Sequence, residues 1–302
     1  MTTRRFTAAF LAVGLLTGCA GMRSVGRPPQ PRHVVFVGFD GLAAWCVKEN
    51  PAAMPTLARL MREGSWSLAS RSILPSSSAC NWHSIFTCSA SEQHGFNNWG
   101  TQTPVFLPSA TGRDGLYPDV FSELREQRPS ARIAYMYEWP GMAYVADTNA
   151  CDFVRNMSDA KLAPLAAKMI REDCPDFLAV VFHNPDGTGH KKGWGSPEYV
   201  ETMKAQDRLL AEVVRAIEDS GRAEDTVLVV TSDHGGNGKG HGGPTLREME
   251  RTLVVWGAGV RPNHEISGST AVYDTGATLA ALLGLEFPQA WIGRPLADAF
   301  ER

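Results

Sequence analysis

The chain has 302 residues, of which 43% are hydrophobic and 20% are charged, a composition typical of a globular protein with one large domain or two small ones. Its formal net charge of −3 argues against a protein that binds nucleic acid through backbone phosphates, because such binding needs a basic face. The sequence therefore predicts a globular protein outside that class.

The first 19 residues are expected to be a targeting segment. Arg4 and Arg5 supply a positively charged start, and the apolar stretch FTAAFLAVGLL is too short to span a bilayer. It ends in LTGC, residues 16–19, which resembles a bacterial lipobox, so Cys19 is the expected lipidation site. The alternative is a plain secretory signal. Residues 20–32 are expected to be a flexible tether, and the protein is expected to be exported and lipid-anchored, facing the periplasm or the cell surface.

Five cysteines remain once Cys19 is set aside. The expected compartment is oxidising, so disulfides are allowed, but an odd number leaves at least one cysteine unpaired or paired between chains. No CxxC pattern occurs, so a cysteine zinc site is not expected. The five are Cys46, Cys80, Cys88, Cys151 and Cys174.

Apolar runs alternate with helical patterns along residues 33–302, the expected single catalytic domain. The apolar runs are typical of strands buried on both faces of a parallel sheet. The alternation predicts an α/β fold, a doubly wound and mostly parallel sheet with helices on both faces. The expected strands are 33–40, 132–139, 176–183, 225–233 and 251–257, and the expected helices are 55–64, 118–128, 159–173, 196–221 and 274–285.

Three consecutive serines follow Pro75 and precede a helical pattern. Ser76 and Ser77 are expected to be turn residues. Ser78 is expected to open a helix, where a serine commonly caps the free backbone N–H groups. The same position favours a bound phosphate oxygen, so a reactive role is compatible with it.

Residues 96–117 show no clear period and are rich in Gly, Pro, Thr and Ser. We expect a long loop or a small cap over the site. Trp99, Phe106 and Tyr144 are expected to pack in the core, with a pocket for a base or aryl group as the alternative.

Polar side chains follow three predicted strands, at the point where each strand ends. Ligands of a doubly wound sheet bind beyond the carboxyl ends of its strands. Carboxylates and imidazoles together suit Zn²⁺, and a catalytic Zn²⁺ takes about three protein ligands, so six such residues divide into two ions. The six are Asp40, Asp186, His190, Asp233, His234 and His241.

Each of these residues has a simpler explanation when taken alone. Asp40 can cap the helix that follows it, and Asp186 with His190 four residues later is a weak indication of a metal. Three unrelated caps at three strand ends are less expected than one shared site, so the pattern as a whole favours metal.

These motifs, in this order between residues 33 and 296, resemble the alkaline phosphatase superfamily, and within it the type I phosphodiesterase/nucleotide pyrophosphatase family. The matching pieces are VGFDG, SSSACNWHSIFTCSASEQHGF, PDGTGH, TSDHGG with a later HGG, and YDTGATLAALLGL. The chain departs from the family pattern at Ser78, where Thr is more common, at Cys80, where Pro is frequent, and at Cys88, where Gly is usual.

The resemblance implies a set of roles for this chain. Ser78 is the implied nucleophile, bridging or facing two Zn²⁺ ions or other divalent metals, and Asn98 (or its neighbour Asn97) stabilises the transferring phosphoryl group. One metal is implied on Asp40, Asp233 and His234, and the other on Asp186, His190 and His241.

The expected function is a two-zinc phosphodiesterase or nucleotide pyrophosphatase that acts by in-line attack of Ser78 and a phosphoseryl intermediate. Its partner is a small phosphorylated substrate, a nucleotide or another phosphodiester, and it meets a membrane only through the lipid. The alternatives are a phosphomonoesterase on the same site and a non-catalytic surface-binding lipoprotein.

Overall fold

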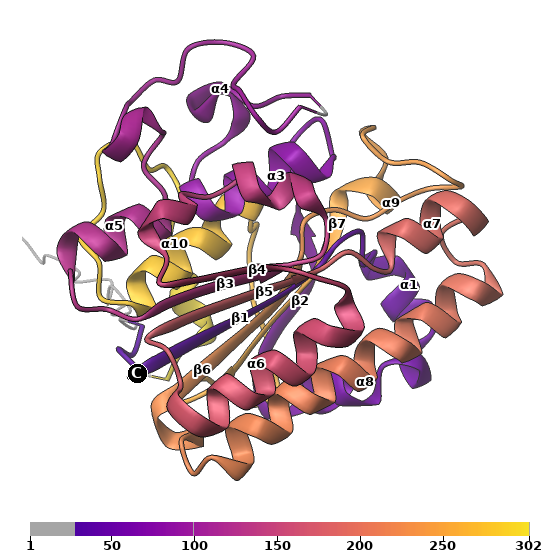
Figure 1. The fold of residues 1–302 in the computed structure, drawn as a ribbon. Coiled ribbons are helices and arrows are strands. Elements are labelled where there is room, and N and C mark those ends of the chain that lie inside the picture. The colour runs from indigo at the N-terminus through magenta and orange to yellow at the C-terminus, as the bar shows by residue number, and fades with distance from the viewer. Residues whose placement is uncertain (1–27, 99, 302) are drawn as a thin grey trace, which may run out of the picture.

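The computed structural model describes residues 28–98 and 100–301. The expected targeting segment with Cys19, most of the tether and Trp99 lie outside the described residues. An eight-stranded sheet in the order β4-β3-β5-β1-β6-β7-β2-β8 forms the centre of the molecule (Figure 1). The strands are β1 His33–Phe39, β2 Ser65–Arg71, β3 Ile133–Tyr137, β4 Phe153–Asn156, β5 Phe177–Phe182, β6 Thr226–Ser232, β7 Glu250–Gly257 and β8 His264–Glu265.

The sheet is mostly parallel, which confirms the predicted fold class. Five neighbouring strands run parallel to one another, in the order β4-β3-β5-β1-β6. The next strand, β7, pairs antiparallel with both β6 and β2. The expected strand at 251–257 is therefore present as β7, but it is not one of the parallel set. The strands β2, β4 and β8 were not predicted.

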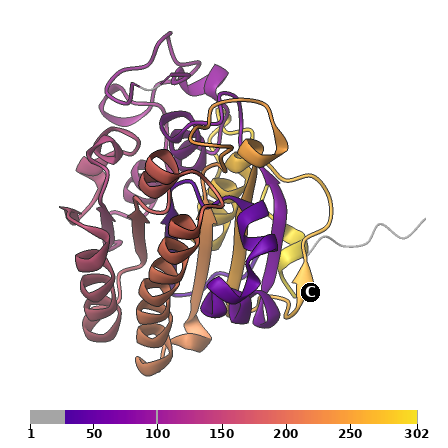
Figure 2. The same ribbon diagram turned by 90° about the vertical axis from the view of Figure 1, so that its right-hand side faces the viewer.

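Helices cover both faces of the sheet (Figures 1 and 2). One face carries α1, α2, α6 and α8, and the other carries α3, α5 and α10. The helices are α1 Ala44–Glu49, α2 Pro55–Glu63, α3 Ser78–Thr87, α4 Ser91–His94, α5 Val120–Gln127, α6 Asp159–Asp173, α7 Asp186–Lys192, α8 Pro197–Asp219, α9 Leu246–Met249 and α10 Val272–Leu282.

The alternation of side chains along β1 shows why this strand is apolar throughout. Val34 and Phe36 pack under α3 and α10, whereas Val35, Val37 and Phe39 pack under the helices of the opposite face. Burial on both faces removes every one of these side chains from water. At roughly 1.5–3 kcal/mol for each large side chain, this burial is a main source of the stability of the sheet centre.

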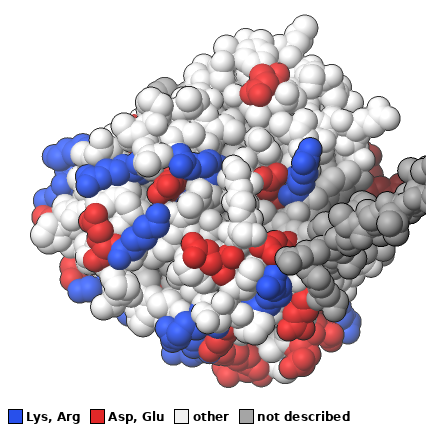
Figure 3. All heavy atoms as spheres, turned by 180° about the vertical axis from the view of Figure 1, so that it is seen from behind, with Lys and Arg blue, Asp and Glu red and all other residues white. Residues whose placement is uncertain are grey.

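The segment 96–117 contains, among its described residues, the 3₁₀ turn Arg113–Gly115 and otherwise irregular backbone. It lies beside α4, at the top of Figure 1. Phe106 and Tyr144 are 40% and 49% exposed, so the expectation that they pack in the core is wrong. Basic and acidic side chains are intermixed on the face shown in Figure 3. Within the described part of the chain, no helix combines the length and the hydropathy needed to cross a membrane.

Candidate active site

Three neighbouring parallel strands bring the predicted site residues together. β1 is paired with β5 on one side and with β6 on the other, so the carboxyl ends of the three strands meet at one edge of the sheet. Asp40 follows β1, and Asp233 and His234 follow β6. Asp186 begins α7, directly after the three-residue loop 183–185 that follows β5. The helical turn at 186–192 places Asp186 and His190 on one face, as the spacing predicted.

We call Asp40, Asp233 and His234 the inner trio. Their ligand atoms all lie within 4.8 Å of one another, and none of the three residues is more than 2% exposed. Nε2 of His234 lies 3.2 Å from Oδ2 of Asp233 and 3.5 Å from Oδ1 of Asp40. The inner trio is thus a compact set of two carboxylates and one imidazole without access to bulk water.

We call Asp186, His190 and His241 the outer trio. Nε2 of His190 lies 3.5 Å from Oδ2 of Asp186, Nε2 of His241 lies 3.6 Å from Oδ1 of Asp186, and the two Nε2 atoms are 3.1 Å apart. The His190 side chain is 39% exposed, so this trio reaches the surface.

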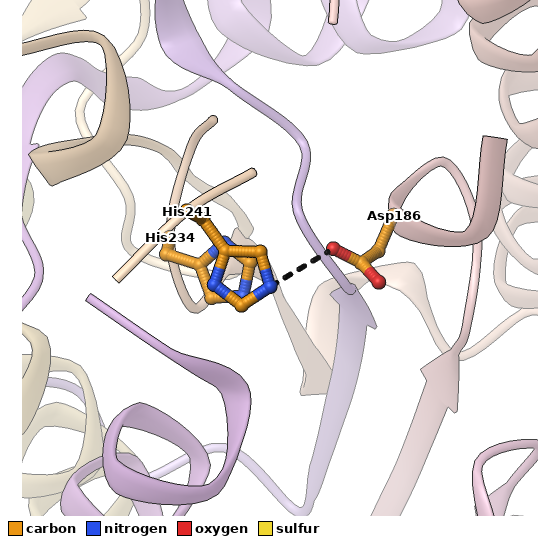
Figure 4. Close-up of side chains that lie close together, drawn as sticks. All are labelled: Asp186, His234 and His241. Carbon is orange, nitrogen blue, oxygen red and sulfur yellow. Dashed lines mark ion pairs between the residues drawn. The ribbon is translucent and has the colours of Figure 1, made fainter. Parts of the chain in front are cut away.

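The two trios adjoin. Asp186, His234 and His241 also place ligand atoms within 4.8 Å of one another. The rings of His234 and His241 stack with centroids 3.9 Å apart, and both face Asp186, with the ion pair between His241 and Asp186 drawn as a dashed line (Figure 4). All six predicted ligands therefore lie in one cluster.

The three histidines of the cluster share one hydrogen-bond arrangement. Nδ1 of His190 lies 3.1 Å from the Lys239 carbonyl oxygen, Nδ1 of His234 lies 2.7 Å from that of Gly235, and Nδ1 of His241 lies 3.0 Å from that of Ser76. A carbonyl oxygen only accepts, so each Nδ1 carries the hydrogen and each Nε2 lone pair faces the carboxylates. Histidines that bind a metal through one ring nitrogen commonly donate the N–H of the other to such an acceptor, which fixes the orientation of the ring.

The electrostatics of the cluster favour a bound cation. Burial, followed by repulsion from Asp233 and Asp186, raises the pKa of Asp40 well above its ordinary value. Burial raises the pKa of both Asp186 and Asp233 to about 7. Oδ1 of Asp186 and Oδ2 of Asp233 are buried without a hydrogen-bond partner among the described residues.

The histidines respond in the opposite direction. Burial lowers the pKa of His234 to about 4, and burial together with His234 lowers the pKa of His241 to about 2. Neutral imidazoles, which offer a nitrogen lone pair, are the form that binds metal. Clustered carboxylates with unsatisfied oxygens and neutral imidazoles fit divalent cations, and the mixed oxygen and nitrogen donors suit Zn²⁺.

Ser78 lies against the inner trio. It is the first residue of α3, its Oγ donates to Oδ1 of Asp40 over 3.2 Å, and it lies 3.0 Å from Nε2 of His234. The residue in the N-cap position is Ser77, and no side chain caps the helix. The Ser78 hydroxyl therefore does not cap the helix, and the interpretation of Ser78 as a helix cap is wrong.

Asn98 lies near the start of α3, where its backbone carbonyl accepts from Sγ of Cys80 over 3.7 Å. Its side chain is exposed, and its Oδ1 accepts a hydrogen bond from the Gly100 N–H over 2.7 Å. Asn97 is exposed as well. Among the described residues, Asn98 has no hydrogen bond to Ser78 or to either trio, so its role at the phosphoryl group stays a prediction.

Trp194 is a site residue that the sequence reasoning missed. Its Nε1 donates to the carbonyl of Gly41, directly after Asp40, over 2.9 Å. Its ring fills the space where a Cβ on Gly189 or Gly236 would lie, only 2.6 and 2.2 Å from ring atoms. The indole thus touches all three ligand-bearing segments. Gly189 in PDGTG and Gly236 in DHGG were the available indication that a bulky group packs against these two segments.

The cysteines at family-variant positions fit the local backbone. Cys88 ends α3 with φ +51° and ψ +28°, the left-handed conformation that glycine adopts most easily, which explains why glycine is usual at this position. Cys80 is buried inside α3. The five cysteines among the described residues are all free.

Comparisons with known proteins agree with this geometry. Residues 34–239 match the family model of type I phosphodiesterase/nucleotide pyrophosphatase. Over 241 residues the chain is 25% identical to bis(5'-adenosyl)-triphosphatase ENPP4 of Bos taurus, covering 74% of this chain and 51% of the relative. Over 207 residues it is 29% identical to GPI ethanolamine phosphate transferase 1 of Emericella nidulans, covering 59% and 22%. The chain thus spans about half the length, or less, of these curated relatives.

A solved structure supports the fold. Murine ectonucleotide pyrophosphatase/phosphodiesterase 5, as an inactive variant in complex with AMP, superposes with a TM-score of 0.71 at 14% identity. The match covers 89% of this chain and all of that one. At this identity the likeness shows the shared α/β fold and nothing about substrate.

Proposed function

Because the chain belongs to the type I phosphodiesterase/nucleotide pyrophosphatase family, we propose that it is a two-zinc hydrolase of phosphoric diesters with Ser78 as its nucleophile. The observation that carries this proposal is the position of the Ser78 hydroxyl, within 3.2 Å of two members of the inner trio. A hydroxyl held beside metal ligands is placed to react, whereas a helix-capping hydroxyl points at backbone amides.

The inner and outer trios would each hold one divalent cation. When bound, such cations polarise phosphoryl oxygens and lower the pKa of an attacking hydroxyl. The residues of this chain do the rest. The backbone carbonyls at the three Nδ1 atoms keep each Nε2 directed inward, and Trp82 Nε1 donates to Oδ2 of Asp40 over 3.2 Å, which holds that carboxylate in place.

In the proposed reaction, Oγ of Ser78 gives up its proton and attacks phosphorus in line with the leaving oxygen. The bond from phosphorus to that oxygen breaks, the first alcohol leaves with a proton, and the phosphoseryl intermediate keeps the other ester group. Water then cleaves the ester between Ser78 and phosphorus, releases the phosphomonoester and restores the hydroxyl. The first turn of α3 presents unpaired backbone N–H groups at Ser78, where they favour a phosphate oxygen. Asn98 is proposed to approach the phosphoryl group when substrate is bound.

A cavity of about 510 Å³ is proposed to hold the organic part of the substrate. It lies beyond the end of β3 and is lined by Tyr137, Trp139, Tyr144 and Asn156, among others. Aromatic rings beside an amide group suit the flat face and polar edge of an aromatic or nucleoside group. The name of the Bos taurus relative, bis(5'-adenosyl)-triphosphatase, supports a nucleotide substrate of this kind.

The test uses the chain without its expected targeting segment, loaded with zinc. We expect hydrolysis of bis-p-nitrophenyl phosphate to exceed that of p-nitrophenyl phosphate, and we expect a chelator to abolish both. Faster hydrolysis of the monoester would favour the phosphomonoesterase alternative. A zinc-loaded protein that hydrolyses neither compound would favour the non-catalytic lipoprotein.

We also propose that the protein is exported and lipid-anchored through Cys19, on the strength of the lipobox-like LTGC. The measurement is the distribution of full-length protein between membrane and soluble fractions. Cys19→Ser is expected to move the protein out of the membrane fraction or to block its processing. Unchanged fractionation and mass would contradict the anchor.

A further inference from the structure

Ser76 joins two segments that are 165 residues apart in sequence. Its Oγ donates to the Gly243 carbonyl over 2.7 Å and accepts from the Gly242 N–H over 3.1 Å. Its backbone carbonyl accepts from Nδ1 of His241 over 3.0 Å. The residue is fully buried. Ser76 therefore makes more than the local turn that the sequence predicted.

The segment that Ser76 holds is intrinsically flexible. Residues 238–243 include glycines at 238, 240, 242 and 243, and Gly238 and Gly242 have φ of +60° and +106°. Glycine loses more conformational entropy than any other residue when it is ordered, so such a loop needs external contacts to keep one conformation. Outside Ser76, the loop is also held by the Asn237–Gly240 bridge and by the hydrogen bond from the Gly243 N–H to Glu248. Two further hydrogen bonds reach it from α7 and the segment just after it, from Nδ1 of His190 to the Lys239 carbonyl over 3.1 Å and from the Trp194 N–H to the Gly238 carbonyl over 2.8 Å.

We propose that Ser76 is a positioning residue that fixes His241 and so sets the metal affinity of the outer trio. The inference rests on the proposed function, because it requires His241 to be a metal ligand. The backbone carbonyl of Ser76 fixes the His241 tautomer, and the hydroxyl fixes the loop that carries the ring. Since Ser78 is two residues further on, one short segment positions both the nucleophile and a ligand of the outer trio.

The inner trio has no hydrogen bond to Ser76 among the described residues and is oriented by hydrogen bonds of its own. Nδ1 of His234 donates to the carbonyl of the adjacent Gly235, and Oδ1 of Asp233 accepts from the Gly41 N–H over 3.1 Å. Loss of the Ser76 hydroxyl should therefore weaken one metal site and spare the other. A residue that only stabilised the fold would affect both sites alike or neither.

The chain supplies a matched control in the next residue. Ser77 is also buried, but among the described residues its hydroxyl has one hydrogen bond, to Sγ of Cys80 over 3.5 Å. The experiment titrates zinc into the metal-free wild type, Ser76→Ala and Ser77→Ala against a chromophoric chelator. Thermal unfolding of the metal-free proteins is measured in parallel.

We expect the wild type and Ser77→Ala to bind two zinc ions. Ser76→Ala should bind one ion with wild-type affinity and the second about 10- to 100-fold more weakly, the usual effect of losing a contact that orients a ligand. Two ions bound by Ser76→Ala with wild-type affinity would overturn the inference alone. Fewer than two ions on the wild type would overturn the proposed function and the inference with it.

A second measurement needs no variant. In the zinc-loaded wild type, ¹⁵N NMR of the imidazoles is expected to show a hydrogen on Nδ1 of His241 that exchanges slowly with solvent. An Nδ1 without a hydrogen, or one that exchanges as fast as an exposed imidazole, would overturn the role of Ser76 even if Ser76→Ala failed to fold.

Discussion

The inner and outer trios are built from the same residue types but on different supports. The inner trio follows the ends of β1 and β6, and its side chains are at most 3% exposed. The outer trio stands on the short helix α7 and on a glycine-rich loop, and the His190 side chain is 39% exposed. One trio is therefore fixed by the central sheet, whereas the other is fixed by contacts between loops.

This difference predicts unequal metal sites. Ligands on strand ends are already held in place by the sheet ladder, so binding a cation there orders little additional chain. Ligands on a loop must be ordered by their neighbours, here Ser76 and Trp194. We expect the inner trio to retain its metal more tightly and the outer trio to exchange metal with solvent more readily.

The largest expected effect tests whether the inner trio serves Ser78. Ser78→Ala removes the attacking oxygen but no trio member, so we expect kcat to fall by about 10⁴-fold or more while both zinc ions remain bound. The measurement pairs diesterase kinetics with metal analysis of the same sample. A zinc-loaded Ser78→Ala variant that keeps substantial activity would rule out Ser78 as the nucleophile.

A direct comparison of the two trios comes next. Asp233→Asn removes a buried carboxylate of the inner trio, and we expect activity to fall more than about 100-fold without recovery in excess zinc. His190→Gln removes a half-exposed ligand of the outer trio. We expect its activity to fall less at limiting zinc and to recover in part as zinc is raised.

The measurement is activity against free zinc concentration for both variants. Lys191→Gln is the matched control for His190→Gln, because Lys191 is the exposed neighbour on α7. If added zinc rescued Asp233→Asn as well as His190→Gln, the two trios would be equivalent, and the comparison between them would fail.

Trp194 contacts segments that carry ligands of both trios, so a change at Trp194 should weaken zinc binding at both trios to a similar extent. Trp194→Phe removes the Nε1 hydrogen bond to Gly41 and leaves most of the ring packing. We expect the affinity for both zinc ions to fall about 10-fold, with a loss of about 1 kcal/mol in the free energy of unfolding.

Trp291→Phe is the matched control for this change. Trp291 is likewise buried and donates Nε1 to a backbone carbonyl, that of Pro118, over 2.9 Å, but it packs on the opposite face of the sheet. We expect a similar loss of stability and unchanged zinc affinity. Equal zinc affinities for Trp194→Phe and Trp291→Phe would show that Trp194 does not help to hold the zinc ligands in place.

The sequence predicted the sheet centre and the ligands at strand ends for one physical reason. A strand buried on both faces is apolar along its length, so the first polar residue after it marks the carboxyl end of the strand. Asp40 was found in this way, and Asp186 and Asp233 were found in the polar segments that follow two further such strands, β5 and β6. The strands β2, β4 and β8 lie away from the sheet centre and are short or only partly apolar, so they lack this pattern.

Other features depend on contacts between distant segments. Ser76 meets its partners 165 to 167 residues away, and Trp194 meets Gly41 at a separation of 153. The residues next to Ser76 in the sequence predict only a turn after Pro75. They carry no information about the distant loop at 241–243 that packs against Ser76 in the fold. The same limit applies to Asn98. It lies in an irregular loop, so no periodic pattern shows whether its side chain reaches the phosphoryl group.

A last comparison sets the trios against a buried carboxylate outside them, whose loss is expected to leave zinc binding and activity unchanged and to alter only stability and its pH dependence. Oδ1 of Asp119 accepts from the Ser122 N–H, and Oδ2 accepts from the Asp147 N–H, yet burial still raises its pKa to about 7. The folded state therefore binds more protons than the unfolded state between about pH 4 and pH 7, so this group's contribution to stability falls as pH rises through that range.

Asp119→Asn removes this titration, and any cost of placing an amide near Asp147 is the same at every pH. The stability advantage of the wild type over Asp119→Asn should therefore shrink between pH 5 and pH 7.5, by up to about 2 kcal/mol, in urea unfolding of the zinc-loaded proteins. The trio carboxylates are common to both proteins and cancel in the difference. A difference that stays constant or grows with pH would show that two amide donors are sufficient to keep a buried carboxylate ionised in this fold. The unsatisfied oxygens of Asp186 and Asp233 would then be the distinguishing property of the metal cluster, rather than burial itself.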